Sequence, residues 1–301
     1  MLAPRIASLS LVAYFDKPPD SLNALVHRLL EISAQLLGDQ AIVLEMPSGQ
    51  RRARLINDID FCGEGFGAHV PVSVEEYEQY GIIDSAWVLN YEVWGGVCSE
   101  RIGPALFLDL NLELLDANSK KRLLPWTVEF FGILGNYGIE SGIGDVADFY
   151  EISRGRYYSG AGLSWVHPQR QFNRYLWAKA GPERIKKLRG IYWGSYLGPE
   201  MVAKLGSASR LKEGYLASGG VDLTKPRKAG TRSERQLTLI QEKIERDKAL
   251  CHIYGNGAML FLLDTQISRF CYPYDTGMFQ LDVSKRYAWL YGRLRQADLL
   301  V

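Results

Sequence analysis

The strongest constraint on the fold is a run in which leucine occupies every second position. The alternating set is Leu106, Leu108, Leu110, Leu112 and Leu114. Between these leucines lie a phenylalanine, an aspartate, an asparagine and a glutamate. Leucine favours helices, but a strict period of two outweighs that weak propensity and predicts a strand. A strand with one apolar and one polar face is typical of an antiparallel sheet that rests one face on the core.

Other segments supply partners for this strand and helices to cover it. The segments predicted as strands are 5–15, 41–46, 51–56, 84–94, 127–134 and 258–264. Residues 22–36 carry apolar side chains at helical spacing, and Gly38 ends that helix. Strands and helices follow one another without regular βαβ alternation. This order predicts an α+β fold with a largely antiparallel sheet and packed helices, in a single compact domain over residues 1–301.

A strand and a helix also close the chain. Residues 278–283 alternate like a strand, and Ser284 can cap a final helix. The apolar positions of that helix predict that Tyr287, Leu290, Tyr291 and Leu294 face inward. This closing pair has the same plan as the opening strand and helix. An internal strand–helix duplication would explain that likeness, but the residue identities do not support it strongly.

The segment of residues 190–206 combines a strand, a Gly-Pro junction and a short helix. Residues 191–197 alternate as a strand does, and Gly198 interrupts them. Pro199 suits the first position of a helix, where its missing N–H would be unpaired in any case. Gly206 can adopt the left-handed conformation that ends a helix. None of these residues is a convincing nucleophile, general base or metal ligand, so we expect the segment to hold other elements in place.

Charge divides the chain into an acidic and a basic half. Residues 1–150 carry 10 Lys/Arg and 21 Asp/Glu, a net charge of −11. Residues 151–301 carry 25 Lys/Arg and 13 Asp/Glu, a net charge of +12, and this half is rich in aromatic residues. The two halves either fold against each other or present faces of opposite sign to partners. The intramolecular explanation is the simpler one.

Motifs that carry chemistry are missing from the sequence. It contains no phosphate-binding G-x-x-x-x-G-K-[ST] loop, no H-E-x-x-H and no G-x-S-x-G. The four histidines are isolated, with no second ligand at metal spacing. Ser209 and Lys212 match the S-x-x-K pattern of some acylating enzymes, but so short a match arises easily by chance. We therefore expect no catalytic residue, no cofactor and no metal.

The four cysteines and the absence of apolar runs bear on location. Cys62, Cys98, Cys251 and Cys271 are far apart, which is typical of buried thiols in a reducing compartment. No apolar run approaches the roughly 18–20 residues that span a membrane. The N-terminus lacks a basic start and a continuous apolar segment, which favours a mature strand over a signal peptide. These features predict a cytoplasmic protein.

Two acidic, glycine-punctuated segments are predicted to be loops. They are residues 57–67 and 136–151. In the second, Asp145, Asp148 and Glu151 could share one helix face as a carboxylate cluster for a metal or for acid–base work. The surrounding glycines argue against a regular helix, so a solvated acidic loop is the simpler interpretation.

Residues 190–206 also carry a resemblance to known proteins. With the N-terminal strand and helix of residues 6–37 and the aromatic middle, they resemble the immunity protein 52 family of type VI secretion effector–immunity pairs. The wider type VI immunity families share a W-x-x-x-L-G-x-x-x-x-x-x-L-G pattern. Its places are held here by Trp193, Leu197, Gly198, Leu205 and Gly206. The resemblance implies a cytoplasmic antitoxin that binds and blocks a cognate effector, expected to be a nuclease toxin, and it implies no catalytic residues.

The acidic loops are the expected contact with that toxin. Nuclease surfaces that bind substrate are usually basic, since phosphate neutralisation drives their binding. An acidic patch on the inhibitor would raise the association rate. The residues expected to bind the partner are Asp58, Asp60, Glu64, Asp145, Asp148 and Glu151. Two alternatives remain open: a hydrolase or transferase with an unrecognised site, and a nucleic-acid binder that uses the basic, aromatic half.

Overall fold

The computed structural model describes thirteen stretches of the chain. They are residues 7–37, 42–45, 51–54, 66–71, 85–92, 96–97, 100–101, 104–112, 115–148, 182–188, 190–218, 250–262 and 281–300. The strands are β1 (Ala7–Phe15), β2 (Ile42–Glu45), β3 (Arg51–Arg54), β4 (Phe66–Pro71), β5 (Ser85–Glu92), β6 (Gly96–Val97), β7 (Glu100–Arg101), β8 (Ala105–Asn111), β9 (Ile139–Asp148), β10 (Gly194–Leu197), β11 (Cys251–Tyr254) and β12 (Gly257–Phe261). The helices are α1 (Leu22–Leu37), α3 (Ala117–Asn136), α6 (Pro199–Lys204), α7 (Ala208–Ser218) and α9 (Leu281–Gln296), together with the 3₁₀ helix η2 (Pro182–Lys186).

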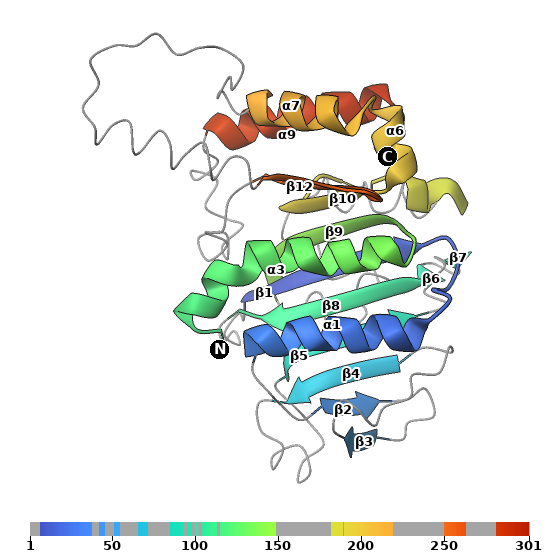
Figure 1. Ribbon diagram of the computed structural model, residues 1–301, viewed down its shortest axis with the longest axis vertical. Coiled ribbons are helices and arrows are strands. Elements are labelled where there is room, and N and C mark those ends of the chain that lie inside the picture. Colours follow the sequence, from blue (N-terminus) through green and yellow to red (C-terminus); the bar gives the residue numbers. More distant parts are fainter. Residues whose placement is uncertain are drawn as a thin grey trace, which may run out of the picture.

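One antiparallel sheet runs through the described part of the molecule. Its strand order is β11-β12-β10-β9-β1-β8-β5-β4-β2-β3, and β6 and β7 form a separate pair. Figure 1 shows α1 and α3 side by side across the sheet, with α6, α7 and α9 gathered at the β11–β12 end. The α+β class and its antiparallel sheet are therefore confirmed. The sheet passes without a break from the acidic half to the basic half, because β9 pairs with both β1 and β10.

The first part of the leucine run forms β8, as its period of two predicted. The strand ends at Asn111, so Leu112 lies beyond it, and Leu114 lies outside the described ranges. Leu106, Leu108 and Leu110 are fully buried and lie opposite alternate residues of β1. On its other side β8 pairs with β5, so the strand is central. Its neighbour β1 carries Leu9 and Leu11 at the paired positions, also fully buried. These leucines of β8 and β1 form the sheet side of the hydrophobic core.

Two segments after β8 have the opposite structure to the one predicted. Residues 127–134 are part of helix α3, and residues 139–148 of the expected acidic loop form β9. In α3 the buried positions Leu123, Phe130 and Leu134 recur at helical spacing over twenty residues, which a window of eight residues does not show. In β9 the glycines are needed for packing, so they do not mark a turn.

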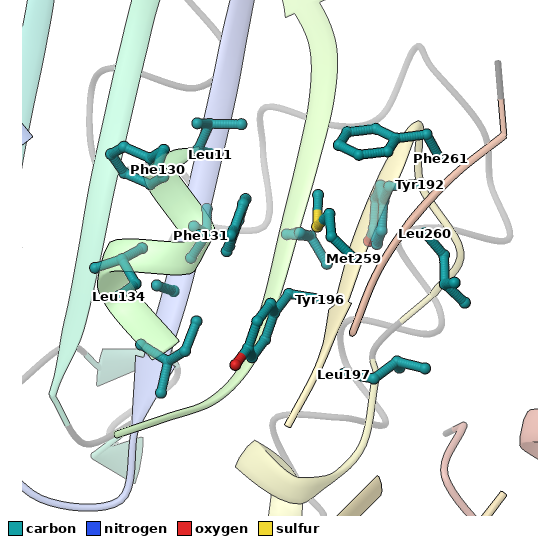
Figure 2. Close-up of a cluster of buried hydrophobic side chains, with 14 of the residues drawn as sticks. Leu11, Phe130, Phe131, Leu134, Tyr192, Tyr196, Leu197, Met259, Leu260 and Phe261 are labelled. Carbon is teal, nitrogen blue, oxygen red and sulfur yellow. The ribbon is translucent and has the colours of Figure 1, made fainter. Parts of the chain in front are cut away.

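Glycines on β9 and β10 make room for aromatic side chains. Gly142 and Gly144 alternate along β9, and Gly194 lies opposite Gly144 on β10, so all three face the same side of the sheet. A Cβ on Gly142 would collide with the ring of Phe131 from α3, and one on Gly194 would lie 2.6 Å from Cε of Met259. Figure 2 shows Phe131, Tyr196 and Met259 packed beside β9. The glycine row lets α3 approach the sheet closely.

The closing unit differs from its prediction in two ways. Helix α9 begins at Leu281, so residues 281–283 are helical and Ser284 lies inside the helix and does not cap it. The strand required for an internal strand–helix duplication is thus missing from residues 281–283, while residues 278–280 lie outside the described ranges. Leu290 and Leu294 face inward as expected, but Tyr287 and Tyr291 are exposed. The inward face includes Arg286 instead, which is buried.

Candidate protein-binding surfaces

The segment of residues 190–206 is a scaffold near the β11 edge of the sheet and holds other elements in place, as expected. Gly194–Leu197 form β10 between β9 and β12, while residues 191–193 are buried but lie outside the strand. Gly198 donates its N–H to the carbonyl oxygen of Glu140 at 3.0 Å, and α6 begins at Pro199. Gly206 has a φ of +112°, the left-handed conformation predicted for the end of this helix.

Two tyrosines, Tyr196 of this segment and Tyr254 of β11, tie the β10–β12 end to α3. The ring of Tyr196 stacks on Phe131 with centroids 5.6 Å apart, and its hydroxyl donates to the carbonyl oxygen of Asn256. The hydroxyl of Tyr254 donates to the carbonyl oxygen of Val128 in α3 at 2.6 Å. Burial raises the pKa of both phenols. These contacts make the β10–β12 end stiff, so the elements outside it are held in fixed positions.

The opposite face of this end is covered by α7 and α9. Cys251 and Tyr254 are three residues apart on β11, so their side chains point to opposite faces. Tyr254 points to α3. On the other face, the hydroxyl of Tyr215 from α7 donates to the carbonyl oxygen of Phe261 at 2.8 Å, and its ring lies 6.0 Å from Trp289 of α9. Burial raises the pKa of the Cys251 thiol to about 12. This end therefore has helices on both faces.

The structure places two of the six predicted partner-binding residues. Asp145 and Asp148 lie on β9, where their backbones pair with Ser10 and Ala7 of β1. They belong to a strand, so the predicted loop and the alternative of a shared helix face are both wrong for them. The other four residues, Asp58, Asp60, Glu64 and Glu151, lie outside the described ranges. Contact of these six with a partner stays a prediction.

An acidic cluster that sequence spacing did not reveal lies at the start of β9. Glu140 is half-buried, and burial raises the pKa of its carboxyl, with further contributions from the nearby Glu200, Asp16 and Glu183. Lys186 offsets part of this charge, and its Nζ lies 3.3 Å from Oε2 of Glu200. These carboxylates come from separate segments of the chain. Only the fold brings them together, so no local motif could have predicted the cluster.

Helix α9 carries a second surface, formed by aromatic and basic side chains. Tyr287, Tyr291 and Arg295 follow one stripe at i, i+4 and i+8, and we call these three residues the α9 stripe. The tyrosine rings are stacked with centroids 6.2 Å apart and 13° between their planes. They are 40% and 43% exposed. Close to the end of the stripe, Nζ of Lys187 lies 2.7 Å from Oδ2 of Asp298.

Two further observations concern metals and membranes. Within the described stretches, no three His, Cys, Asp or Glu side chains gather in a way that could hold a metal ion. Among the helices of those same stretches, none is both long enough and apolar enough to cross a membrane. The cytoplasmic location stays a prediction.

Comparison with known proteins places the fold beside that of a secretion-system protein. No family model and no curated protein matches the chain. Among solved structures, the chain is similar to the type VI secretion system (T6SS) protein PA0821 of Pseudomonas aeruginosa, with a TM-score of 0.53 and 13% sequence identity. The likeness covers 96% of this chain and 72% of that one. At this identity it shows the fold alone, and membership of the immunity protein 52 family stays a proposal.

Proposed function

We propose that this chain is an immunity protein that binds and neutralises a cognate T6SS effector by direct protein–protein contact. The observation that carries the proposal is the likeness of fold to a T6SS protein over 96% of the chain. The W-x-x-x-L-G-x-x-x-x-x-x-L-G residues support it, since Trp193, Leu197 and Leu205 are buried in the framework of the β10–β12 end. In this role the chain carries out no catalytic step and needs no cofactor.

The described structure suits an inhibitor that works by occupying a surface. An inhibitor loses less conformational entropy on binding when its contact elements are already fixed. Here the β10–β12 end is held by helices on both faces and by the hydrogen bonds of Tyr196, Tyr215 and Tyr254. Charged residues of both signs lie around this framework, which gives a partner complementary patches to recognise.

The expected effector is a nuclease, and the expected contact is acidic. Asp58, Asp60, Glu64, Asp145, Asp148 and Glu151 are the proposed contact residues. A nuclease that binds phosphates presents basic side chains, so carboxylates on the inhibitor would attract it at long range and compete with its substrate. The cluster of Glu140, Glu183 and Glu200 adds negative charge at the start of β9.

Binding to the protein encoded beside this chain's gene tests the proposal. The two proteins are co-expressed, co-purified and measured by isothermal titration calorimetry, and the growth of cells that produce the effector is followed with and without this chain. We expect a stable complex and restored growth. If the purified chain neither binds the effector nor protects the cells, the immunity role is wrong.

Charge reversal tests the acidic contact separately. Asp58→Lys, Asp60→Lys and Glu64→Lys in one variant should weaken the complex and make growth rescue incomplete. A matched control reverses three acidic residues elsewhere, Asp20, Glu31 and Glu129, which are all exposed. Exposed charges contribute little to folding, so the control variant should remain folded, and circular dichroism checks the fold of both variants before their affinities are compared. Equal affinity of the two variants would rule out these three carboxylates as the contact.

A further inference from the structure

We infer that the α9 stripe of Tyr287, Tyr291 and Arg295 is a docking surface for an acidic patch on the effector. This inference rests on the proposed function and names a second contact, separate from the acidic residues above. Its basis is the exposure and stacking of two tyrosines on a helix whose other side is packed against the core through Leu290 and Leu294.

The two tyrosines are the exposed large hydrophobic residues among the described part of the chain. Stacking fixes each ring against the other, so little rotamer freedom remains to be lost when a partner covers them. Tyrosine and arginine are enriched among the residues that dominate protein–protein binding energy. A stacked tyrosine pair that continues into Arg295 therefore has the composition of an interface centre.

Packing of α9 leaves this stripe on a flank that α7 does not cover. Trp289 meets α7, since its ring lies against Tyr215 and close to Gly214. Leu290 and Leu294 are buried below the helix. The stripe lies on the opposite side of α9 from Trp289, because residues two positions apart point to nearly opposite sides of a helix. The three stripe residues stay together because i, i+4 and i+8 are neighbours on a helix surface. Arg293 secures the helix by donating from Nη2 to the carbonyl oxygen of Leu205 at 2.8 Å.

Positive charge at the end of the stripe identifies the chemistry of the partner. Lys187, Lys204 and Arg295 all lie near enough to Asp298 to lower the pKa of its carboxyl, with the hydrogen bond from Lys187 the largest cause. Three cations around one carboxylate leave excess positive charge. Lys204 and Arg295 are exposed. An acidic surface on the effector, with an apolar residue to cover the tyrosine rings, complements this arrangement.

The test measures effector binding by calorimetry at two salt concentrations. Tyr287→Ala with Tyr291→Ala should raise the dissociation constant by about 30-fold or more, the range of interface hot spots. Arg295→Glu should weaken binding and reduce its dependence on salt, because one charge pair is replaced by repulsion. Tyr287→Phe with Tyr291→Phe keeps the rings and should retain most of the affinity.

A matched control and separate readouts keep the outcomes distinct. Lys121→Glu reverses an exposed charge on α3, away from the stripe, and should leave affinity unchanged. If the wild type binds the effector and the tyrosine and Arg295 variants bind it equally well, the docking surface is wrong and the immunity role stands. No binding by the wild type would overturn both. Self-association or DNA retention that the stripe variants abolish, with effector binding intact, would assign the stripe to another partner and overturn the inference.

Discussion

Gly198 occupies a position where a side chain would meet backbone directly. A Cβ there would collide with the carbonyl oxygen of Glu140, the same atom that accepts the Gly198 N–H. Its φ of −66° is open to any residue, so the cost of substitution is steric. We predict that Gly198→Ala lowers the free energy of unfolding by about 1–3 kcal/mol. Urea denaturation followed by circular dichroism measures this difference.

Gly292 is the matched control for that substitution. It lies in α9 with nothing within 4 Å of the place of a Cβ. Gly292→Ala should leave stability unchanged or raise it by up to about 1 kcal/mol, because alanine favours a helix. If Gly198→Ala were as stable as Gly292→Ala, the close approach of β9 to the Gly-Pro junction would be wrong.

Cys251 should be unreactive in the native protein. Its thiol is buried on the α7 side of β11, and burial raises its pKa to about 12, so it stays protonated at neutral pH. Only the thiolate reacts readily with alkylating reagents. Iodoacetamide labelling read by peptide mass spectrometry should leave Cys251 unmodified until urea unfolds the chain. Rapid labelling under native conditions would show that β11 is accessible.

At the scale of single elements, α3 has a defined start that can be tested. The carboxylate of Asp116 accepts the N–H of Ser119 at 2.6 Å, and this bond lowers the pKa of the Asp116 carboxyl. The contribution is present above the ordinary pKa and is lost as pH falls through the lowered one. Asp116→Ala should lower the midpoint of thermal unfolding, whereas Asp116→Asn should keep it close to wild type, since asparagine caps equally well. A scan at neutral pH compares them.

The elements found correctly from the sequence are those whose pattern is local. The period of two in β8 and the helical spacing of α1 need no distant partner to be recognised. Besides the closing unit, the errors fell on α3 and β9, which depend on each other. Glycine usually marks a turn, but Gly142 is required because Phe131 of α3 lies over it. A sequence pattern cannot show a contact between two elements that are both misassigned.

The same reasoning explains why the sequence did not predict the α9 stripe or the acidic cluster around Glu140. Tyr287 and Tyr291 have the spacing of a core stripe, and only the placement of Leu290 and Leu294 shows that they lie on the exposed flank. The acidic cluster around Glu140 gathers residues from four segments, which spacing alone does not connect. Charge imbalance could be counted from the sequence, but its position on the molecule required the fold.

At the scale of the whole molecule, stability should fall at alkaline pH. The pKa values of Cys251, Tyr196, Tyr215 and Tyr254 are all raised by burial above their ordinary values of 9.0 and 10.0. The native state keeps these protons while the unfolded chain releases them, so their contribution is full below about pH 9 and is lost as pH rises through the window above it.

Urea midpoints at pH 7, 9 and 10.5 measure this dependence. Tyr196→Phe removes one of the four groups and should make the loss of stability with pH shallower. The same substitution removes the hydrogen bond to Asn256, so at pH 7 it should cost about 1 kcal/mol. A free energy of unfolding that stays constant up to pH 10.5 would contradict the burial of these groups.

The position of β9 between β1 and β10 has a consequence for how the chain is made. A ribosome releases β9 well before β10, so the nascent protein holds a long strand whose outer row of amides and carbonyls awaits its neighbour. Premature stop codons between residues 149 and 193 would leave that row permanently open. Such truncated products should precipitate and be degraded, so they would not accumulate as an inert half-protein.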